Sequence, residues 1–271
     1  MALSHPVKVI AIAGGKGGIG KTNISVNLAI ALASLKQRVM LLDADLGLAN
    51  VDVLLGLSIK KNLSHVLKGE CDLSEIIIDG PGNIKIVPAA SGIQGMTHLS
   101  SAEHAGVVQA FSELQDDLDV LLVDTAAGIS DSVVTFCRAA QEVIMIVCNE
   151  PTSITDAYAS IKVLSQHHQL SHFQVIANMV SDAEEGRELF TRLVRAADRF
   201  LDVNLSYCGF VPYDNNLRKA VQRQKSSYLS YPTSGSSLAI KNIAQKIMTW
   251  PVPGVPGDHL SFFLERIIQA A

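Results

Sequence analysis

The chain has 271 residues, of which 48% are hydrophobic and 18% are charged, and its formal net charge at pH 7 is −4. This length suits one large α/β domain or two small ones. The slightly negative net charge excludes a positive charge over the whole protein that would attract nucleic acid. No stretch resembles a secretory signal, and no run of about 18 apolar residues could span a bilayer, so we expect a cytoplasmic protein.

Apolar runs typical of strands alternate with helical patterns along the chain. We predict strands at residues 7–13, 38–42, 84–88, 120–123, 142–147, 174–178 and 207–211. Helices are predicted at residues 22–35, 102–114, 129–140, 154–167, 184–200 and 215–224. This alternation is typical of an α/β fold with a doubly wound, mainly parallel sheet flanked by helices. We therefore expect one domain over residues 1–249, with its ligand at the carboxyl ends of the strands.

The first predicted strand leads into a glycine-rich loop and then into a helical segment. From Gly15 the loop follows G-x-x-x-x-G-K-[ST], the pattern that wraps backbone N–H groups around phosphate oxygens. In this pattern Lys21 neutralises the outer phosphates and the hydroxyl of Thr22 binds Mg²⁺. The sequence therefore predicts a nucleoside triphosphate site, to which the loop contributes Gly15, Gly17, Gly18, Ile19, Gly20, Lys21, Thr22 and Asn23.

Carboxylates follow two further apolar strands. Asp124 directly follows the apolar strand of residues 120–123, as the aspartate of a Walker B motif does. Its carboxylate would hold Mg²⁺ through a coordinated water. Asp43 and Asp45 follow residues 38–42, where they could support the metal and position an attacking water. Aspartate at a strand end is also a common turn or capping residue, but the phosphate loop ahead of both strands favours the metal site.

The order K-G-G-x-G-K-T at residues 16–22 resembles the deviant Walker A motif of the MinD/ParA ATPases. Residues 42–52 resemble switch I of that family, and residues 124–128 resemble its Walker B motif and switch II. The similarity covers essentially the whole chain and implies a MinD-like P-loop fold that binds ATP and ADP and hydrolyses ATP slowly. A narrower resemblance, to the family's regulators of flagellar number, rests on residues 46–56, 86–95 and 150–158.

The resemblance implies roles for single residues. Lys16 would cross the interface of an ATP-bound homodimer and stabilise charge on the partner's nucleotide, so hydrolysis would depend on dimerisation. The alternative is a Lys16 that touches only its own phosphates or solvent. Asp45 would orient the hydrolytic water, and Asp43 would lie near the metal.

Further nucleotide contacts are implied outside the loop. In the family, adenine is recognised around an asparagine after a late strand and around a proline-containing loop. The corresponding positions here are Asn178 and the loop of Pro212, Tyr213 and Asp214, while Glu150 would reach ribose across the dimer. Asn178 and Pro212 also fit as ordinary turn residues at strand ends.

The end of the chain has a separate pattern. Three prolines and two glycines within residues 250–257 predict a linker that cannot continue the preceding helix. Residues 258–271 predict a C-terminal amphipathic helix, which Asp258 can cap. The resemblance implies membrane targeting at the inner face of the cell membrane, yet the polar face offers few basic side chains. The apolar face of this helix could either contact the membrane reversibly or dock on the domain or a partner. That face consists of Leu260, Phe263, Leu264, Ile267 and Ile268.

A short basic run occupies residues 218–225. Arg218, Lys219 and Arg223 would lie partly on one side of a helix. Both a solvated helix face and a docking surface for an acidic partner or nucleic acid are compatible with this run.

We expect a dimerising ATPase switch that regulates flagellar number or placement by binding a flagellar transcriptional activator. A nitrogenase-reductase-like metal or electron carrier would need paired cysteines at a dimer interface, so the scattered cysteines of this chain disfavour that class. A ParA-like DNA-segregation ATPase is disfavoured by the net acidity and the tail, and we expect no specific nucleic acid partner. The four cysteines are far apart, and buried free thiols are favoured for Cys71, Cys137, Cys148 and Cys208.

Overall fold

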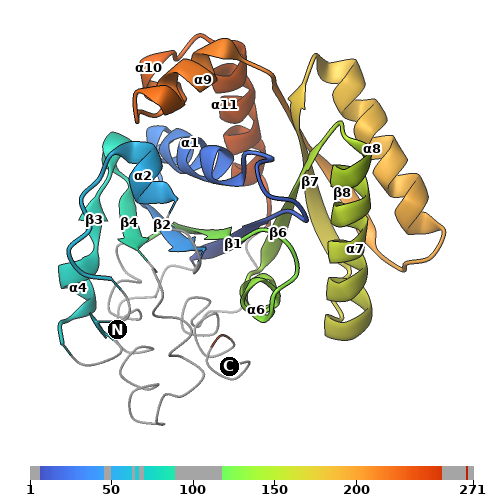
Figure 1. Ribbon diagram of the computed structural model, residues 1–271, viewed down its shortest axis with the longest axis horizontal. Helices are drawn as coiled ribbons and strands as arrows, with labels where there is room; N and C mark the ends of the chain where they lie inside the picture. Colours follow the sequence, from blue (N-terminus) through green and yellow to red (C-terminus); the bar gives the residue numbers. More distant parts are fainter. Residues whose placement is uncertain are drawn as a thin grey trace.

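The computed structural model describes residues 7–45, 50–62, 65–66, 70–88, 118–251 and 267. Within them the strands are β1 (Lys8–Ala13), β2 (Val39–Ala44), β3 (Ile78–Asp79), β4 (Lys85–Pro88), β5 (Val120–Thr125), β6 (Glu142–Cys148), β7 (His172–Val180) and β8 (Asn204–Pro212). They form one sheet in the order β3-β4-β2-β5-β1-β6-β7-β8, seen at the centre of Figure 1. All neighbouring pairs are parallel except β3 with β4. All seven predicted strands are confirmed, and the unpredicted β3 is only two residues long.

The helices also follow the predicted alternation. They are α1 (Lys21–Ser34), α2 (Val51–Leu55), α4 (Leu73–Ile76), α6 (Asp131–Ala139), α7 (Pro151–His168), α8 (Ala183–Asp198), α9 (Asn215–Gln222), α10 (Ser227–Ser230) and α11 (Gly235–Met248). A short 3-10 turn, η1, covers Pro81–Asn83. The helices predicted near α1, α6, α7, α8 and α9 are confirmed, whereas the helix predicted at residues 102–114 lies outside the described residues.

Helix α11 has no counterpart among the predicted helical ranges, although its sequence contains the signals for one. Ile240, Ile243 and Ile247 recur at helical spacing and are all buried. The hydroxyl of Ser234 accepts a hydrogen bond from the backbone N–H of Ser237, which caps the start of the helix. These local signals are sufficient to predict α11, so the predicted set of helices is wrong in lacking it.

Helices cover both faces of the sheet, as predicted for a doubly wound fold (Figure 1). One core joins α1 and α11 to one face, and a second core joins α6, α7 and α8 to the other. The central strands are buried along their whole length, because both of their faces are covered. Helix α1 is buried on nearly all sides for the same reason, since it lies between the sheet and α11.

The parallel strands bring the predicted site residues to one edge of the sheet. Asp43 on β2 stands beside Asp124 on β5, and Asp124 in turn stands beside Ile12 on β1. The glycine-rich loop begins directly after β1, at that same edge. Strand β7 ends there as well, with an irregularity between Asn178 and Val180.

Two expectations about the rest of the chain are tested in part. All four cysteines are free thiols, as predicted. Cys137, Cys148 and Cys208 are buried, as predicted, whereas Cys71 is only partly buried. None of the helices in the described residues is long and apolar enough to cross a membrane. The linker and the C-terminal helix predicted over residues 250–271 lie outside the described residues, apart from Trp250, Pro251 and Ile267.

Candidate nucleotide site

The glycine-rich loop is packed tightly against two other elements. A Cβ atom on Gly15 would lie 2.3 Å from the backbone carbonyl of Asp156 in α7, so no larger residue fits. Gly20 has a φ of 87°, which favours glycine, and a Cβ there would lie 2.6 Å from the side-chain nitrogen of Asn178. The loop is thereby held between α7 and β7 in a fixed shape.

The loop is open at Gly17 and Gly18, which are both exposed. A Cβ atom on either Gly17 or Gly18 would meet nothing within 4 Å among the described residues. The loop is also joined to the predicted switch II, because the backbone N–H of Gly128 donates to the carbonyl of Gly14 over 3.1 Å. The loop ends at the N-terminus of α1, where helix N–H groups and the helix dipole favour an anion.

The carboxylate of Asp124 fits a metal site. It is fully buried, and the hydroxyls of Thr22 and Ser25 hydrogen-bond to it, Ser25 over 2.7 Å to Oδ1. Its Oδ2 has no hydrogen-bond partner within the described part of the chain. Burial raises the pKa of Asp124 to about 7, and the nearby carboxylate of Asp43 adds to this rise. A buried, unpartnered carboxylate oxygen beside a threonine hydroxyl supplies hard oxygen donors of the kind Mg²⁺ prefers.

Lys21 supplies the positive charge at this end of the loop. Its side chain is almost fully buried, and its amine donates to the carbonyl of Lys16 over a long 3.4 Å. Burial lowers the pKa of Lys21, while the carboxylates of Asp124 and Asp45 act in the opposite direction. A desolvated ammonium with weak internal partners is well suited to bind phosphate oxygens.

Asp43 is engaged by the backbone of the segment that follows β2. Its Oδ1 accepts from the N–H of Asp45 over 3.1 Å, and its Oδ2 accepts from the N–H groups of Asn50 and Val51 over 3.2 Å each. Burial raises the pKa of Asp43 in spite of these bonds. Asp43 therefore lies near the expected metal position but already holds the start of α2.

Asp45 lies at the end of the same strand and is partly exposed. Its Oδ2 accepts a hydrogen bond of 2.9 Å from the side-chain amide of Asn50. The amide of Asn50 thus fixes the carboxylate that the sequence predicts to orient water. Residues 46–49, which belong to the predicted switch I, lie outside the described residues.

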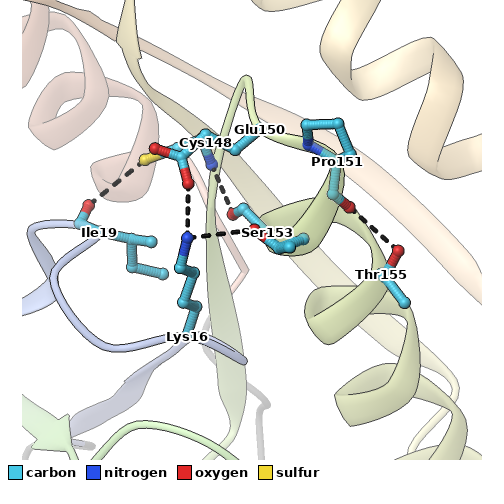
Figure 2. Close-up of polar contacts among 8 residues, drawn as sticks. Lys16, Ile19, Cys148, Glu150, Pro151, Ser153 and Thr155 are labelled. Carbon is cyan, nitrogen blue, oxygen red and sulfur yellow. Dashed lines mark hydrogen bonds and ion pairs between the residues drawn. The ribbon is translucent and has the colours of Figure 1, made fainter.

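Lys16 lies on the outer side of the loop, in surroundings unlike those of Lys21. Figure 2 shows its side chain extending to the carboxylate of Glu150. The amine is 2.6 Å from Oε2 of Glu150 and 3.1 Å from the hydroxyl of Thr152, and the hydrogen bond to Glu150 raises the pKa of Lys16. Both side chains are exposed, so this ion pair contributes little to stability. Two residues predicted to reach a partner's nucleotide are here paired with each other.

A cavity of about 320 Å³ lies beside the loop. The predicted residues Gly20, Asn23, Asn178, Pro212, Tyr213 and Asp214 all line it. The structure adds others that the sequence did not indicate, namely Ile24, Met179, Leu217, Arg218 and Val221. A pocket of this size with mixed apolar and polar walls can accept a nucleobase.

Two polar residues of this cavity also hold the fold together. The side-chain nitrogen of Asn178 donates to the carbonyl of Ile19 over 2.7 Å. The carboxylate of Asp214 accepts from the N–H of Asn216 and from the N–H and hydroxyl of Ser236, which joins α9 to α11. The structure therefore places both residues at the cavity, and their contact with a base stays a prediction.

Among the described residues, some side chains that hydrogen-bond to Lys16, Asp45 and Asp124 were not identified from the sequence. Ser25 binds Asp124, Asn50 binds Asp45, and Thr152 binds Lys16. Ser25 follows Lys21 by one helical turn, which is a signal that could have indicated it. Asn50 and Thr152 lie within segments that resemble the MinD/ParA family, but nothing in their spacing specifies these contacts.

Comparison with known proteins assigns the family. A family model described as "ParA: NUBPL iron-transfer P-loop NTPase" matches residues 6–248. Antiactivator FleN of Pseudomonas aeruginosa is 60% identical over 269 residues, which covers 99% of this chain and 96% of the relative. Flagellum site-determining protein YlxH of Helicobacter pylori is 35% identical and covers 97% of this chain and 90% of the relative.

Solved structures agree with this assignment. The MinD cell division protein of Aquifex aeolicus superposes with a TM-score of 0.70 and 25% identity, covering 91% of this chain and 99% of that chain. The family model and the relatives span nearly the entire sequence, and the loop, strand ends and cavity described above lie within the matched region. The chain is a member of the MinD/ParA family of P-loop ATPases.

Proposed function

We propose that this protein is a Mg²⁺-dependent ATPase switch that dimerises with ATP and restrains the formation of flagella. The observation that carries the nucleotide part is the convergence of Lys21, Thr22 and the unpartnered Oδ2 of Asp124 at the head of the phosphate loop. The regulatory part rests on the identity to FleN, named an antiactivator, and to YlxH, named a flagellum site-determining protein.

The structure supports a division of the nucleotide between two regions. The open surface at Gly17 and Gly18, together with the amine of Lys21, would bind the phosphates. Thr22 and Asp124 would hold Mg²⁺, which when bound supplies positive charge that offsets the negative charge developing on the phosphate oxygens. The cavity beside Asn178 would receive adenine, with ADP retained there after hydrolysis.

Hydrolysis adds one water to ATP and releases ADP, inorganic phosphate and a proton. An oxygen of water bonds to the γ-phosphorus while the bond from that phosphorus to the β–γ bridging oxygen breaks. Asp45 would orient this water by accepting one of its hydrogen bonds, and the amide of Asn50 keeps that carboxylate in place. Because the carboxylate only orients a weak nucleophile, we expect slow turnover.

Lys16 would complete the site of a second copy. In the single chain its amine is bound by Glu150 and Thr152, away from the phosphate region around Lys21. In an ATP-bound dimer the amine would leave Glu150 and approach the partner's phosphates, and Glu150 would be free to reach ribose. Hydrolysis would then require two copies, as with a finger residue supplied in trans.

The C-terminal segment would give the switch an output at the membrane. Ile267 is 2% exposed and belongs to the core that contains Leu73 and Phe136. This burial supports docking of the tail on the domain of a single chain, with release in the ATP-bound dimer and peripheral contact with the inner face of the membrane. Co-sedimentation with anionic liposomes should therefore increase from ADP to ATP. Equal binding that does not depend on residues 258–271 would reject this step.

The regulatory proposal is tested in a Pseudomonas aeruginosa strain that lacks FleN. Expression of this chain should restore the flagellar number of the parent strain, and Asp45→Ala should change that number because the nucleotide cycle is blocked. A purified flagellar transcriptional activator should bind the wild-type chain directly. Unrestored flagellar number at normal protein levels, with no binding of the activator, would overturn the regulatory part while leaving the ATPase intact.

A further inference from the structure

Positive and negative side chains are segregated in this chain. Residues 215–251, which contain α9, α10 and α11, hold six Lys and Arg and no Asp or Glu. The other residues hold 16 Lys and Arg against 26 Asp and Glu, so the net charge is +6 for this segment and −10 for the remainder. The three helices lie together on one side of the sheet, at the top of Figure 1. A protein of net negative charge thus has one strongly basic layer.

Several cations of this layer are exposed to solvent, although the guanidinium of Arg223 donates to the hydroxyl of Tyr231 and the amine of Lys246 donates to the carbonyl of Tyr207. Lys219, Arg223, Lys225 and Lys241 are all exposed. Among the described residues, no ion pair involves the segment 215–251. No carboxylate lies within the segment, and Asp214, which directly precedes α9, is bound by the N–H and hydroxyl of Ser236. The segment itself therefore carries a net positive charge, although Asp52 lies on α2 beside Val53.

Apolar side chains are exposed among the same helices. Leu229 on α10 and Leu238 on α11 are each 49% exposed, and α10 packs against both α9 and α11. Val53 on α2 is 62% exposed, and its carbonyl accepts a hydrogen bond of 2.9 Å from the side chain of Gln224, just after α9. Nucleic acid is bound chiefly through its phosphates, whereas apolar side chains interspersed with cations are typical of protein interfaces.

We propose that this layer is a docking surface for an acidic segment of another protein that also carries apolar or aromatic side chains. The docking surface comprises Val53, Lys219, Arg223, Lys225, Leu229 and Leu238. Charge complementarity would steer and orient the partner, and the exposed leucines and valine would be buried on contact. This assignment goes beyond the proposed function, because it names the surface and the chemistry of the partner.

The docking surface adjoins the nucleotide site through two elements. Leu217 and Val221 of α9 line the cavity proposed for adenine. Helix α2, which carries Val53, begins at the backbone N–H groups held by Asp43. Movement of α2 or α9 on nucleotide binding would therefore alter the docking surface, which gives the partner a way to distinguish ATP from ADP.

The test uses the full chain without nucleotide, so it stands apart from the ATPase proposal. The probes are a random copolymer of Glu and Tyr, poly-Glu, and duplex DNA, each titrated against the protein at low and at physiological salt. The copolymer should bind most tightly. The triple variant Lys219→Glu, Arg223→Glu and Lys225→Glu should weaken this binding by about tenfold or more, and Leu229→Ser should reduce the preference for copolymer over poly-Glu.

A matched control carries the same change of charge on the opposite face of the sheet. It combines Lys162→Glu, Arg187→Glu and Arg195→Glu on α7 and α8 and should keep the binding of wild type. Equal loss in both triple variants, tightest binding of DNA, or no binding of either polypeptide would overturn the proposal. Circular dichroism checks folding. If the triple variant does not fold, the single variants Lys219→Glu and Lys225→Glu are titrated with the same three probes, and loss of copolymer binding is again the expected result.

Discussion

The two lysines of the phosphate loop lie five residues apart in opposite surroundings. Lys21 is buried near Asp124 and Thr22, in what we call the phosphate end of the site. Lys16 is exposed and paired with Glu150, in what we call the outer rim. The phosphate end has its groups preplaced by burial, whereas the outer rim has its charged groups engaged with each other on the surface.

This difference would let one loop bind nucleotide and also make hydrolysis depend on a second copy. Preplaced groups in a low-dielectric site cost little reorganisation when phosphate arrives. A surface ion pair is weakly held, so Lys16 can exchange Glu150 for a phosphate of a second copy at small cost. In the proposed switch, the phosphate end would bind nucleotide in a single chain, and the outer rim would make hydrolysis depend on two copies.

Loss of the Asp45 carboxylate, which we propose orients the attacking water, should produce the largest effect. Asp45→Ala is expected to lower the rate of ATP hydrolysis by about 10²–10⁴, because the attacking water is no longer held in line with the γ-phosphorus. ATP binding should change little, because Asp45 is not among the residues that line the cavity proposed for adenine. Single-turnover hydrolysis and nucleotide titration separate the two quantities, with Asp79→Asn on β3 as the control. A large loss of ATP binding would place Asp45 in the phosphate end instead.

Removal of Lys16 should affect hydrolysis only where two copies meet. Lys16→Ala is expected to lower the rate at high protein concentration by about 10²–10³, as for other donors that stabilise transition-state charge. The rate per chain should then be independent of protein concentration, whereas wild type should accelerate. Lys36→Ala, an exposed lysine beyond α1, is the control. A wild-type rate of hydrolysis in Lys16→Ala would contradict the proposal that Lys16 acts on the nucleotide of a second copy.

The buried carboxylate of Asp124 should make stability depend on pH. Its pKa in the folded chain is about 7, above the ordinary value of 3.8, so the folded chain retains a proton that the unfolded chain has lost. This group's contribution to stability therefore falls as pH rises from about 4 to 7. Asp124→Asn should be about 2–4 kcal/mol more stable than wild type at pH 8, with no difference at pH 4.

Denaturant unfolding without nucleotide measures this effect. The same variant should lose the additional stability that Mg-ATP gives wild type, because the oxygen predicted to hold the metal is gone. A stability difference that does not vary with pH would show that Asp124 is ionised without metal, and the metal assignment would lose its main support.

Lys21 should contribute to affinity rather than to the fold. Lys21→Gln is expected to weaken ATP binding by about 1.5–3 kcal/mol, the range for a charged hydrogen bond. Because burial lowers the pKa of this amine in the free chain, the neutral replacement should leave thermal stability equal or slightly higher. Fluorescent-nucleotide titration and thermal unfolding give both values, and unchanged affinity would contradict the role of Lys21.

The sheet and the loop could be predicted because their signals are local. Apolar runs such as those of β5 and β6 predict buried strands, and the glycine pattern predicts a phosphate loop from neighbouring residues. Helices α2, α4 and α10 are single turns whose formation depends on contacts such as those of Asp43 with Asn50 and Val51. Single turns carry too few periodic positions to be found in the sequence.

Contacts between distant residues could not be predicted in the same way. Ser25 and Asp124 are 99 positions apart, and Lys16 and Glu150 are 134 apart. The family resemblance brings Lys16 and Glu150 to the same ligand in a dimer, but their pairing within one chain follows only from the packing of α7 against the loop. The charge of residues 215–251 was present in the sequence, and only the fold shows that it forms one layer.

The most direct test of the account is the oligomeric state of wild type and Asp45→Ala, measured by size exclusion with light scattering in Mg-ADP and in Mg-ATP. We predict monomers for both proteins in ADP. In ATP, Asp45→Ala should accumulate as a dimer, because the nucleotide that joins the two copies is no longer hydrolysed, and adding Lys16→Ala should return it to monomer. A persistent Asp45→Ala monomer with bound Mg-ATP would contradict the claim that a second copy completes the site.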